Sequence, residues 1–502
     1  MDDSTETLAA IDLGSNSFHM LIARVSDNGQ LTVVDRQKDM VRLGGGLGPG
    51  NSLSPDAQER ALESLARMGE RLRGMPQGSV RAVGTNTLRK AKAPGFLQKA
   101  QAALGHPIDI IAGVEEGRLI YLGVARGVHA PPDVQRLVVD IGGGSTEVVI
   151  GKELDVVAVE SLYMGCVSFS LAHFPDGALT ARAFEAATLA ARQELRALEH
   201  TFPAIGWAKA IGTSGTIKAV HHILAATGST PQITLDALYE LRERALRAGH
   251  LDALDLDGLS ERRRPVFPGG LAILIGVFES LHLNALQHSE FALREGVLYD
   301  LHGRTTNQDV REATITRLMN QYEVDVPHAL RIERTACELL DAVARDWGLG
   351  ATALERQLRW ACRIHEIGLA IAHGRYHKHG SYIVENADLP GFSRQDQNML
   401  WALVRTHRRR FKPHRFDGLP EDLPTAGRRL CVLMRLAVVL ERARIDHAIP
   451  KELEVFVDGK RITLVFPPGW LDASPLTRAD LESEKVYLHQ GGFILVVEEA
   501  SP

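Results

Sequence analysis

Hydrophobic and polar residues follow two different patterns along the chain. Up to about residue 303, short apolar or alternating runs predict strands separated by amphipathic helices. Beyond that position apolar residues recur with helical spacing, as in 336–344 and 358–364. Short alternating runs return near the C-terminus. Strands are predicted at 31–34, 80–83, 107–111, 156–162, 453–457, 461–466 and 493–497, and helices at 56–73, 114–121, 181–200 and 235–248.

The clearest local pattern is the run 138–150, which reads Val-Val-Asp-Ile-Gly-Gly-Gly-Ser-Thr-Glu-Val-Val-Ile. Three glycines separate an apolar run from an alternating one, which predicts strand, tight turn and strand. The glycines let backbone N–H groups approach an anion closely, and Asp140 and Glu147 could hold a divalent cation against it. The alternative is an ordinary glycine-rich hairpin, since short glycine motifs often occur without a ligand.

The same design occurs a second time. The run 10–22 matches 138–150, with 128 residues between Asp12 and Asp140. A second pair of motifs, Gly-Thr-Asn-Thr at 84–87 and Gly-Thr-Ser-Gly at 212–215, keeps the same spacing. Two motifs at one spacing indicate a duplicated α/β unit, each copy with two Gly/Ser/Thr turns. If the copies face each other, the four turns converge on one cleft.

Length and composition narrow the class of protein. The 502 residues exceed what one hydrophobic core usually serves, and predict three or four domains. A net charge of −5 argues against a generally basic nucleic-acid binder, although a local basic patch remains possible. The acidic N-terminus lacks signal-peptide features and no apolar run approaches a membrane span. Four cysteines without metal-ligand spacing predict reduced thiols and a cytoplasmic location.

Two further charged motifs have alternative interpretations. Glu115 and Glu116 follow a predicted strand and a glycine, where open α/β sheets place ligands. Acids are also favourable in the first turn of any helix because of its dipole. Arg262–Arg264 precede a proline and could attract phosphate, but a solvated loop is the usual fate of such a run and is expected here.

Taken together, these motifs resemble the exopolyphosphatase and guanosine pentaphosphate phosphohydrolase family, which shares its fold with actin, sugar kinases and chaperone ATPases. The resemblance covers nearly the whole chain. It implies an α/β fold of two ribonuclease-H-like domains, expected at 1–128 and 129–303. A helical domain like the His-Asp phosphohydrolases is expected at 304–448 and a small α/β domain at 449–502. The motifs that carry it are 12–17, 84–89, 115–116, 140–147 and 212–216.

The resemblance also implies roles for single residues. Glu116 would be the catalytic base that deprotonates water for in-line attack on a terminal phosphorus. Asp140 and Glu147 would hold Mg²⁺ or another divalent cation. The phosphate-binding residues would stabilise charge on the phosphoryl oxygens. They are Ser15, Asn16, Arg89, Gly142, Gly143, Gly144, Ser145, Thr213, Ser214 and Gly215.

In the helical part, His328, His365 and Asp446 fall near the ligand positions of the His-Asp domain. The central doublet is His365-Glu366 where that domain has His-Asp, so we expect a domain kept for substrate binding. The run 405–415 has six basic residues and no acid. A solvated face is the usual reading, but a linear polyanion gains from such a patch through counterion release. Polyphosphate is therefore expected to bind at Arg405, Arg408, Arg409, Arg410 and Lys412.

The expected activity is processive release of orthophosphate from inorganic polyphosphate, with a homodimer implied by the resemblance. The basic run 405–415, together with 164–169 and 377–379, resembles the exopolyphosphatase branch. The alternative is hydrolysis of guanosine pentaphosphate in the stringent response. A third class is a non-catalytic polyphosphate or alarmone sensor, although a pure binder gains little from acids beside phosphate. A kinase is possible on fold grounds, but no feature names an acceptor.

Overall fold

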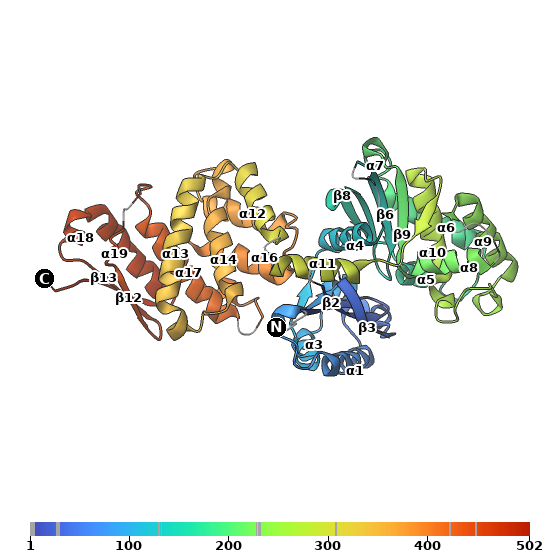
Figure 1. The fold of residues 1–502 in the computed structure, drawn as a ribbon, viewed down its shortest axis with the longest axis horizontal. Helices are drawn as coiled ribbons and strands as arrows, with labels where there is room; N and C mark the ends of the chain where they lie inside the picture. The colour runs from blue at the N-terminus through green and yellow to red at the C-terminus, as the bar shows by residue number, and fades with distance from the viewer. Residues whose placement is uncertain are drawn as a thin grey trace. The chain divides into compact units, whose positions relative to one another are not determined.

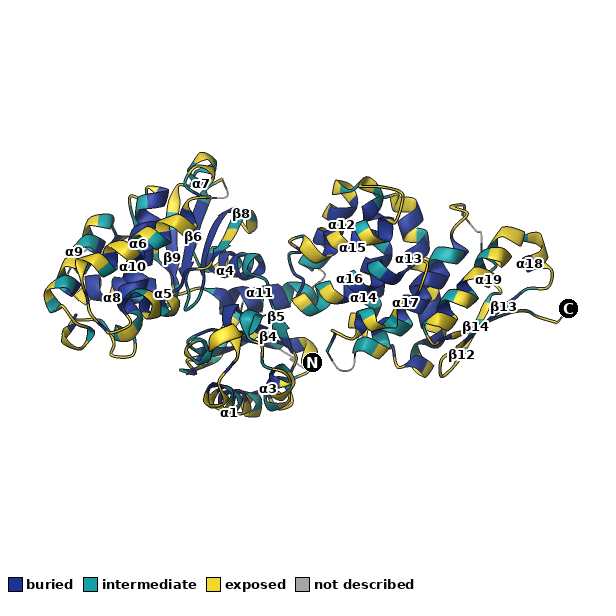
Figure 2. Cartoon of the chain, turned by 180° about the vertical axis from the view of Figure 1, so that it is seen from behind, coloured by how far each residue is buried: buried dark blue, intermediate teal, exposed yellow. Residues whose placement is uncertain are grey.

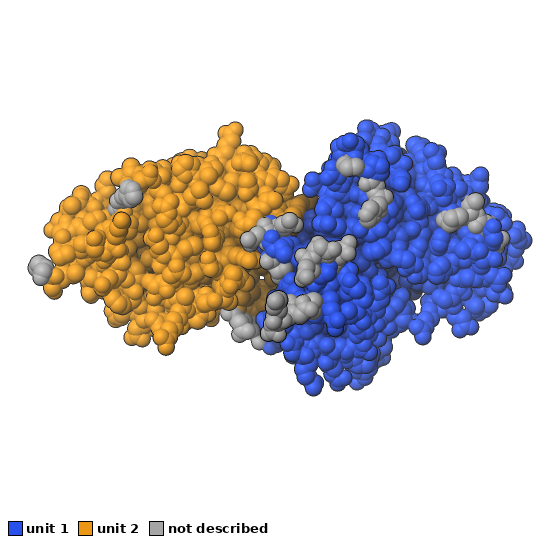
Figure 3. Space-filling model, viewed as in Figure 1, with its two compact units in different colours: residues 1–309 blue, residues 310–502 orange. Residues whose placement is uncertain are grey.

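Two compact units make up the chain, residues 1–309 and residues 310–502 (Figure 3). They are called unit 1 and unit 2, and each is described by itself. The computed structural model describes residues 6–26, 31–128, 131, 133–226, 228, 232–306, 309–420, 423–446 and 449–501. Two of the expected domain boundaries, after 128 and after 448, involve residues outside these ranges.

The first sheet of unit 1 has the order β3-β2-β1-β4-β5 (Figure 1). Alternate residues of its strands face two different cores, as period-2 side-chain alternation requires. One face packs on α1 (Pro55–Leu72) and α3 (Phe96–Leu104), whose apolar residues occupy one side of each helix. The strands are β1 (Thr7–Leu13), β2 (Phe18–Val25), β3 (Leu31–Asp39), β4 (Val80–Gly84) and β5 (Ile108–Ile110).

The second sheet repeats the first. Its order is β10-β11-β9-β6-β7-β8, so β8-β7-β6-β9-β11 corresponds to β3-β2-β1-β4-β5 and β10 is an addition. Asp12 pairs with His19 in the first hairpin, and Asp140 pairs with Glu147 in the second, both 128 residues later. The predicted duplication is confirmed. The strands are β6 (Gln135–Ile141), β7 (Thr146–Lys152), β8 (Asp155–Leu162), β9 (Lys209–Thr213), β10 (Gln232–Ile233) and β11 (Leu286–His288).

Two helices join the sheets through a shared core. Apolar side chains of α4 (Gly113–Gly127) and α11 (Leu293–Thr305) pack with residues from β1 and β2 of one sheet and from β6, β7 and β9 of the other. The helices approach closely, because a Cβ on Gly296 would lie 1.7 Å from the carbonyl oxygen of Leu119. A Cβ on Gly123 would lie 2.2 Å from the carbonyl oxygen of Ala292. Only glycine fits at this crossing.

The second sheet has its own helical cover, with a predominantly apolar helix at its centre. Helix α10 (Phe267–Leu281) is buried along almost its whole length (Figure 2). Among the described residues, one stretch, Arg264–Leu281, is long and apolar enough to cross a membrane, and 78% of it is buried inside the fold. A core helix accounts for that composition. It packs with α5 (Cys166–His173), α6 (Ala181–Leu195), α8 (Ser214–Ala226) and α9 (Leu235–Ala248).

Unit 2 combines eight α-helices with a three-stranded sheet, among the residues that the structure describes there. The sheet has the order β12-β13-β14 and its inner residues share one core with the helices. The terminal α/β segment therefore has no core of its own. The helices are α12 (Val310–Gln321), α13 (Val326–Trp347), α14 (Thr352–Ile364), α15 (Tyr376–Asn386), α16 (Arg394–Thr406) and α17 (Leu423–Leu440), followed by β12 (Glu454–Asp458), β13 (Arg461–Phe466), α18 (Trp470–Ala473), α19 (Pro475–Gln490) and β14 (Ile494–Glu499).

A buried ionic network fixes α4 against its neighbours in unit 1. The Asp300 carboxylate on α11 accepts from Arg81 of β4 at 2.6 Å, from Arg118 of α4 at 2.5 Å and from Arg304 at 2.8 Å. Arg118 also donates to Glu115 at 2.7 Å. Burial alone would raise the pKa of Asp300, but the guanidiniums, Arg118 first, hold it well below its ordinary value. One charged aspartate thus ties a strand and two helices together.

Replacing Asp300 with Asn should destabilise unit 1 by roughly 3–5 kcal/mol, because it removes a buried counter-charge that three guanidinium groups share. Urea unfolding of the full chain measures this, with hydrogen exchange at α4 and α11 assigning the loss to unit 1. The control is Asp133→Asn, whose pair with Lys152 is exposed and should contribute at most about 1 kcal/mol. Equal effects of the two substitutions would contradict this role for Asp300.

Candidate active site

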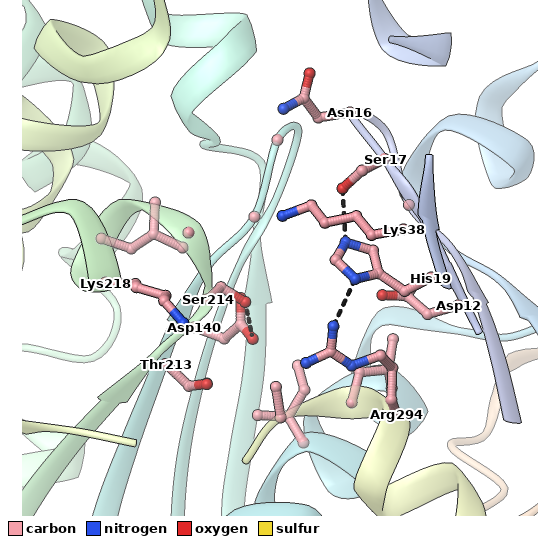
Figure 4. A pocket seen from close by; sticks show the side chains of 18 of the residues that line it. Asp12, Asn16, Ser17, His19, Lys38, Asp140, Thr213, Ser214, Lys218 and Arg294 are labelled. Atoms are coloured by element: carbon pink, nitrogen blue, oxygen red, sulfur yellow. Dashed lines mark hydrogen bonds between the residues drawn. The ribbon is translucent and has the colours of Figure 1, made fainter. Parts of the chain in front are cut away.

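Four turns of unit 1 converge on a cavity of about 580 Å³. They are 14–17 and 85–86 from the first copy and 142–145 and 213–215 from the second. The prediction that the duplicated turns share one cleft is confirmed. Figure 4 shows Asn16 and Ser17 on one side of this cavity and Thr213 and Ser214 on the other.

The turns come close together around the cleft, and glycines stand at the contacts. Asn86 donates from Nδ2 to the carbonyl oxygen of Gly144 at 3.0 Å. A Cβ on Gly143 would lie 3.1 Å from the Cβ of Ser15. A Cβ on Gly165 would lie 2.3 Å from the backbone nitrogen of Gly144. The glycines thus serve close backbone approach, which leaves their N–H groups free of side-chain cover toward an anion.

Ser214 holds a strained position beside the second turn. Its φ of +69° lies in the left-handed region, which is unusual for a residue with a Cβ. Its hydroxyl donates to Oδ2 of Asp140 at 2.6 Å (Figure 4). The strain is therefore coupled to a hydrogen bond within the cleft, as is common at functional sites.

Four acids occupy or border the cleft. Glu116, Asp140 and Glu147 are buried, and Oδ1 of Asp12 is buried without a hydrogen-bond partner. Burial raises the pKa of Asp12 and of Asp140 to about 7, against the opposing effects of Arg294 and the Ser214 hydroxyl respectively. Burial and the neighbouring Glu116 raise the pKa of Glu147 well above its ordinary value.

This arrangement fits a divalent cation. Crowded buried carboxylates disfavour one another's charge, and a bound cation reverses that effect. The unpartnered oxygen of Asp12 and the carboxylate of Asp140 come from equivalent positions of the two copies. Oxygen donors of this kind are those that Mg²⁺ prefers.

Glu116 is positioned by a partner outside the cavity. Arg89 donates from Nη1 to Oε2 of Glu116 at 2.9 Å and to the carbonyl oxygen of Ile111 at 2.8 Å. Burial raises the pKa of Glu116, while Arg89 opposes the rise. Glu116 lines the cavity, whereas Glu115 is turned to Arg118. The adjacent acids therefore divide between the cleft and the ionic network.

Several predicted site residues stand close to the cleft without lining it. Arg89 contacts Glu116 instead of the cavity, and Glu147 accepts a hydrogen bond from the Ser161 hydroxyl at 2.8 Å. The predicted phosphate residues other than Arg89 all line the cavity. They are Ser15, Asn16, Gly142, Gly143, Gly144, Ser145, Thr213, Ser214 and Gly215.

Basic side chains also line the cavity. His19 occupies the position in the first hairpin that Glu147 holds in the second. Arg294 from α11 contacts Nδ1 of His19 at 2.5 Å, and Nε2 of His19 lies 2.7 Å from the Ser17 hydroxyl (Figure 4). Burial and then Arg294 lower the pKa of His19 well below its ordinary value. The imidazole is neutral, so Nδ1 accepts from Arg294 and Nε2 donates to Ser17.

The expectation of a solvated loop at 262–264 is wrong for Arg263. Its guanidinium lies against the second turn, where a Cβ on Gly215 would fall 1.5 Å from Nη2. Arg263 lines the cavity, while Arg262 is exposed. The reason is tertiary: the loop leads into α10, whose first turn packs on α5 and α8.

The sequence-based predictions missed one acid and several basic residues of the cavity. Asp12 was available through the repeat, since it is equivalent to Asp140. The basic side chains Lys38, Lys218 and Arg294 also line the cavity. No local pattern marks them, because they approach only when the sheets and α11 are in place.

The predicted distal basic segment lies on unit 2, after α16. Arg409, Arg410 and Lys412 are exposed, whereas Arg405 is partly buried and Arg408 stacks 4.4 Å over the ring of Tyr376. The segment's backbone is held by buried Arg435, which donates to the carbonyl oxygens of 406 and 409. Three of the five predicted cations are thus freely presented on this surface.

Comparison with known families matches residues 21–305 to the Ppx/GppA phosphatase family and residues 310–485 to its domain III. The chain is 40% identical over 486 residues to guanosine-5'-triphosphate,3'-diphosphate pyrophosphatases from two strains of Vibrio cholerae serotype O1, covering 96% of each chain. Among solved structures it is similar to an exopolyphosphatase-like protein, with 26% identity, a TM-score of 0.52 and 61% and 100% of the two chains covered. An exopolyphosphatase from Cytophaga hutchinsonii gives 24% identity and a TM-score of 0.51, with 59% and 98% covered.

Replacing Asp140 with Asn removes one of the crowded acids at nearly constant volume. Without divalent ions, the variant should be at least as stable as the parent, because like-charge repulsion in the cleft is relieved. The rise in Tm on adding Mg²⁺ should shrink several-fold, since binding to the native state raises stability. Thermal melts in EDTA and in Mg²⁺ measure both effects. Glu185→Gln, an exposed change on α6, is the control, and an Mg²⁺ shift equal to the parent's would contradict the cation site.

Proposed function

Because the chain belongs to the Ppx/GppA phosphatase family, whose members hydrolyse phosphoanhydride bonds, we propose that it removes the terminal 5′ phosphate of guanosine pentaphosphate. The products would be orthophosphate and guanosine tetraphosphate. The observation that carries the proposal is a buried base, Glu116, beside a cleft of four phosphate-binding turns. The similarity to nucleotide pyrophosphatases along nearly the whole chain supports the nucleotide as first substrate.

In the proposed reaction a water oxygen forms a bond to the terminal phosphorus as the bond to the bridging oxygen breaks. Glu116 takes the proton of this water, and burial raises its pKa, which makes the carboxylate a stronger base. Arg89 holds the carboxylate in place, so that one oxygen is oriented by the 2.9 Å contact. A divalent cation held by Asp12 and Asp140, with Glu147 behind them, would offset the charge on the phosphoryl oxygens.

The turns would bind the phosphoryl group being transferred. Backbone N–H groups of 143–145 and 213–215, with Ser15 and Asn16, can donate to its oxygens, while the N–H of Gly142 closes the turn on the carbonyl oxygen of Ser145. Lys38, Arg263 and Arg294 line the same cavity and could neutralise the remaining phosphates of a nucleotide that carries five. The cavity of about 580 Å³ lies within the usual range for ligands of nucleotide size.

Inorganic polyphosphate is the second candidate substrate. The sequence motifs at 164–169, 377–379 and 405–415 favour it, whereas the relatives at 40% identity support the nucleotide. The exposed cations Arg409, Arg410 and Lys412 are the structural feature in its favour, because a long polyanion can reach a surface far along the chain. The same cleft would serve both substrates, so measured rates decide which of the two is preferred.

The choice of substrate is tested by kcat/KM for guanosine pentaphosphate and for long-chain polyphosphate under one set of conditions. We expect the nucleotide to have the higher value. Glu116→Gln should lower kcat for both by about 10²–10⁴-fold with little change in KM, because the base acts in the chemical step. Glu160→Gln, an exposed change on β8, is the control. A higher kcat/KM for polyphosphate would make polyphosphate the preferred substrate. Undiminished phosphate release by Glu116→Gln would reject the mechanism.

The basic surface gives a separate prediction for polyphosphate. The double substitution Arg409→Glu with Arg410→Glu leaves Arg408 on its tyrosine and should raise KM for long chains several-fold. Tripolyphosphate should be affected little, and the loss for long chains should fade at high salt. Rates at several salt concentrations measure this. An equal loss for both lengths would show that the segment serves the fold instead.

A further inference from the structure

Four histidines are buried close together in unit 2, on residues that the proposed hydrolysis does not use. His328 lies on α13, His365 at the end of α14, His377 on α15 and His407 at the end of α16, the helices grouped in Figure 2. Their exposed fractions are 4%, 1%, 8% and 1%. Each has one buried ring nitrogen without a hydrogen-bond partner: Nδ1 of His328 and His377, and Nε2 of His365 and His407. Such groups are costly unless something binds them.

The tautomers of two of these histidines follow from their other ring nitrogen. Nδ1 of His365 lies 2.7 Å from the carbonyl oxygen of Cys362, and Nδ1 of His407 lies 2.7 Å from that of Val404. A carbonyl only accepts, so both Nδ1 atoms carry the proton. The lone pair of Nε2 is then free on each ring. A metal-bound histidine has this arrangement, with the far nitrogen donating to a carbonyl that orients the ring.

Two of the rings and one carboxylate lie close together, and the His407 ring lies next to them. One ligand atom each from His328, His365 and Glu366 lies within 4.8 Å of the others. The His407 ring centroid is 5.4 Å from that of His365, and the rings are nearly perpendicular at 88°. Ligands on one zinc ion at bond lengths of about 2.1 Å are roughly 3.5 Å apart. Movements of these side chains would therefore bring their ligand atoms to the spacing that zinc needs.

The carboxylate in this group is Glu366. With its proton on Nδ1, the His365 ring can present the lone pair of Nε2 as a ligand must. Arg444 donates to Oε1 of Glu366 at 2.5 Å, and the same oxygen lies 3.9 Å from Nε2 of His365. Asp446, near a ligand position of the His-Asp domain by sequence, is largely exposed and pairs with Arg331 at 3.1 Å. The structure therefore brings together a different ligand set from the one the resemblance implied.

We propose that His328, His365, Glu366 and His407 form a binding site for one transition-metal ion, zinc in the first place. Neutral imidazoles with one carboxylate suit zinc, cobalt or nickel, whereas magnesium prefers oxygen ligands throughout. The ligands come from α13, the end of α14 and the end of α16, so a bound ion cross-links three helices of unit 2. Arg408 and Arg444 are the nearby positive charges, and Arg444 weakens cation binding by neutralising Glu366.

The test uses the full chain without an affinity tag, stripped with EDTA and then dialysed against Zn²⁺ in excess Mg²⁺ to occupy the carboxylate cleft. We expect one zinc per chain, at least about tenfold weaker binding in His365→Gln and none in His365→Gln with His407→Gln. Arg444→Gln should bind zinc more tightly. His489→Gln, an exposed change on α19, is the matched control.

Cobalt gives a readout that distinguishes the two sites. Co²⁺ in a four-coordinate site with three imidazoles has intense visible absorption, which six oxygen ligands in the cleft do not produce. The parent should show these bands and the double variant should lack them, while circular dichroism and phosphate release confirm that the variant is folded. Zinc content or cobalt spectra that are the same in the parent and the folded double variant would overturn the proposal.

Discussion

Unit 1 is built around the difficulty of keeping four carboxylates together out of water. Burial raises the pKa of Asp12, Glu116, Asp140 and Glu147, and neighbouring carboxylates add to the rise for Asp12, Asp140 and Glu147. Each is offset by a different neighbour or left unmatched. Arg89 pairs with Glu116, hydroxyl groups donate to Asp140 and Glu147, and one oxygen of Asp12 has no partner. A cation can neutralise the charge that remains, and it can bind a polyanionic substrate at the same time.

That cluster can exist only on a rigid frame. Helix α4 carries Glu115 and Glu116 in successive positions, and the two side chains have different roles. Glu115 joins Arg118 and the network around Asp300, which fixes the helix to β4 and α11. Glu116 is then presented to the cleft with little freedom to move away from its like-charged neighbours. The buried ion pairs in unit 1 thus matter for orientation more than for net stability.

Much of this arrangement could be predicted from sequence, and the failures share a cause. The glycine turns, the hairpins and the repeat are local or periodic, so the four turns followed from spacing, and their shared cleft followed on the condition that the copies face each other. Arg263 was assigned to solvent because a charged run usually lies there, and only the packing of α10 brings it to Gly215. Arg294 and Lys38 carry no local signal at all. In unit 2 the basic segment could be recognised from its composition. The contact between His365 and His407 could not, because it depends on where the ends of two helices lie in the fold.

The crossing of α4 and α11 has a consequence for how such an enzyme can diverge. With glycine against backbone at Gly123 and at Gly296, neither helix can shift along or roll over the other without a collision. Repacking of the helices therefore cannot move Glu116 on α4, and the two glycines at the crossing cannot be replaced by larger residues. Divergence in substrate preference is left to the rim, where Lys38, Lys218 and Arg263 stand on elements that can vary independently. A conserved reaction with a drifting substrate range is the evolutionary pattern this geometry permits.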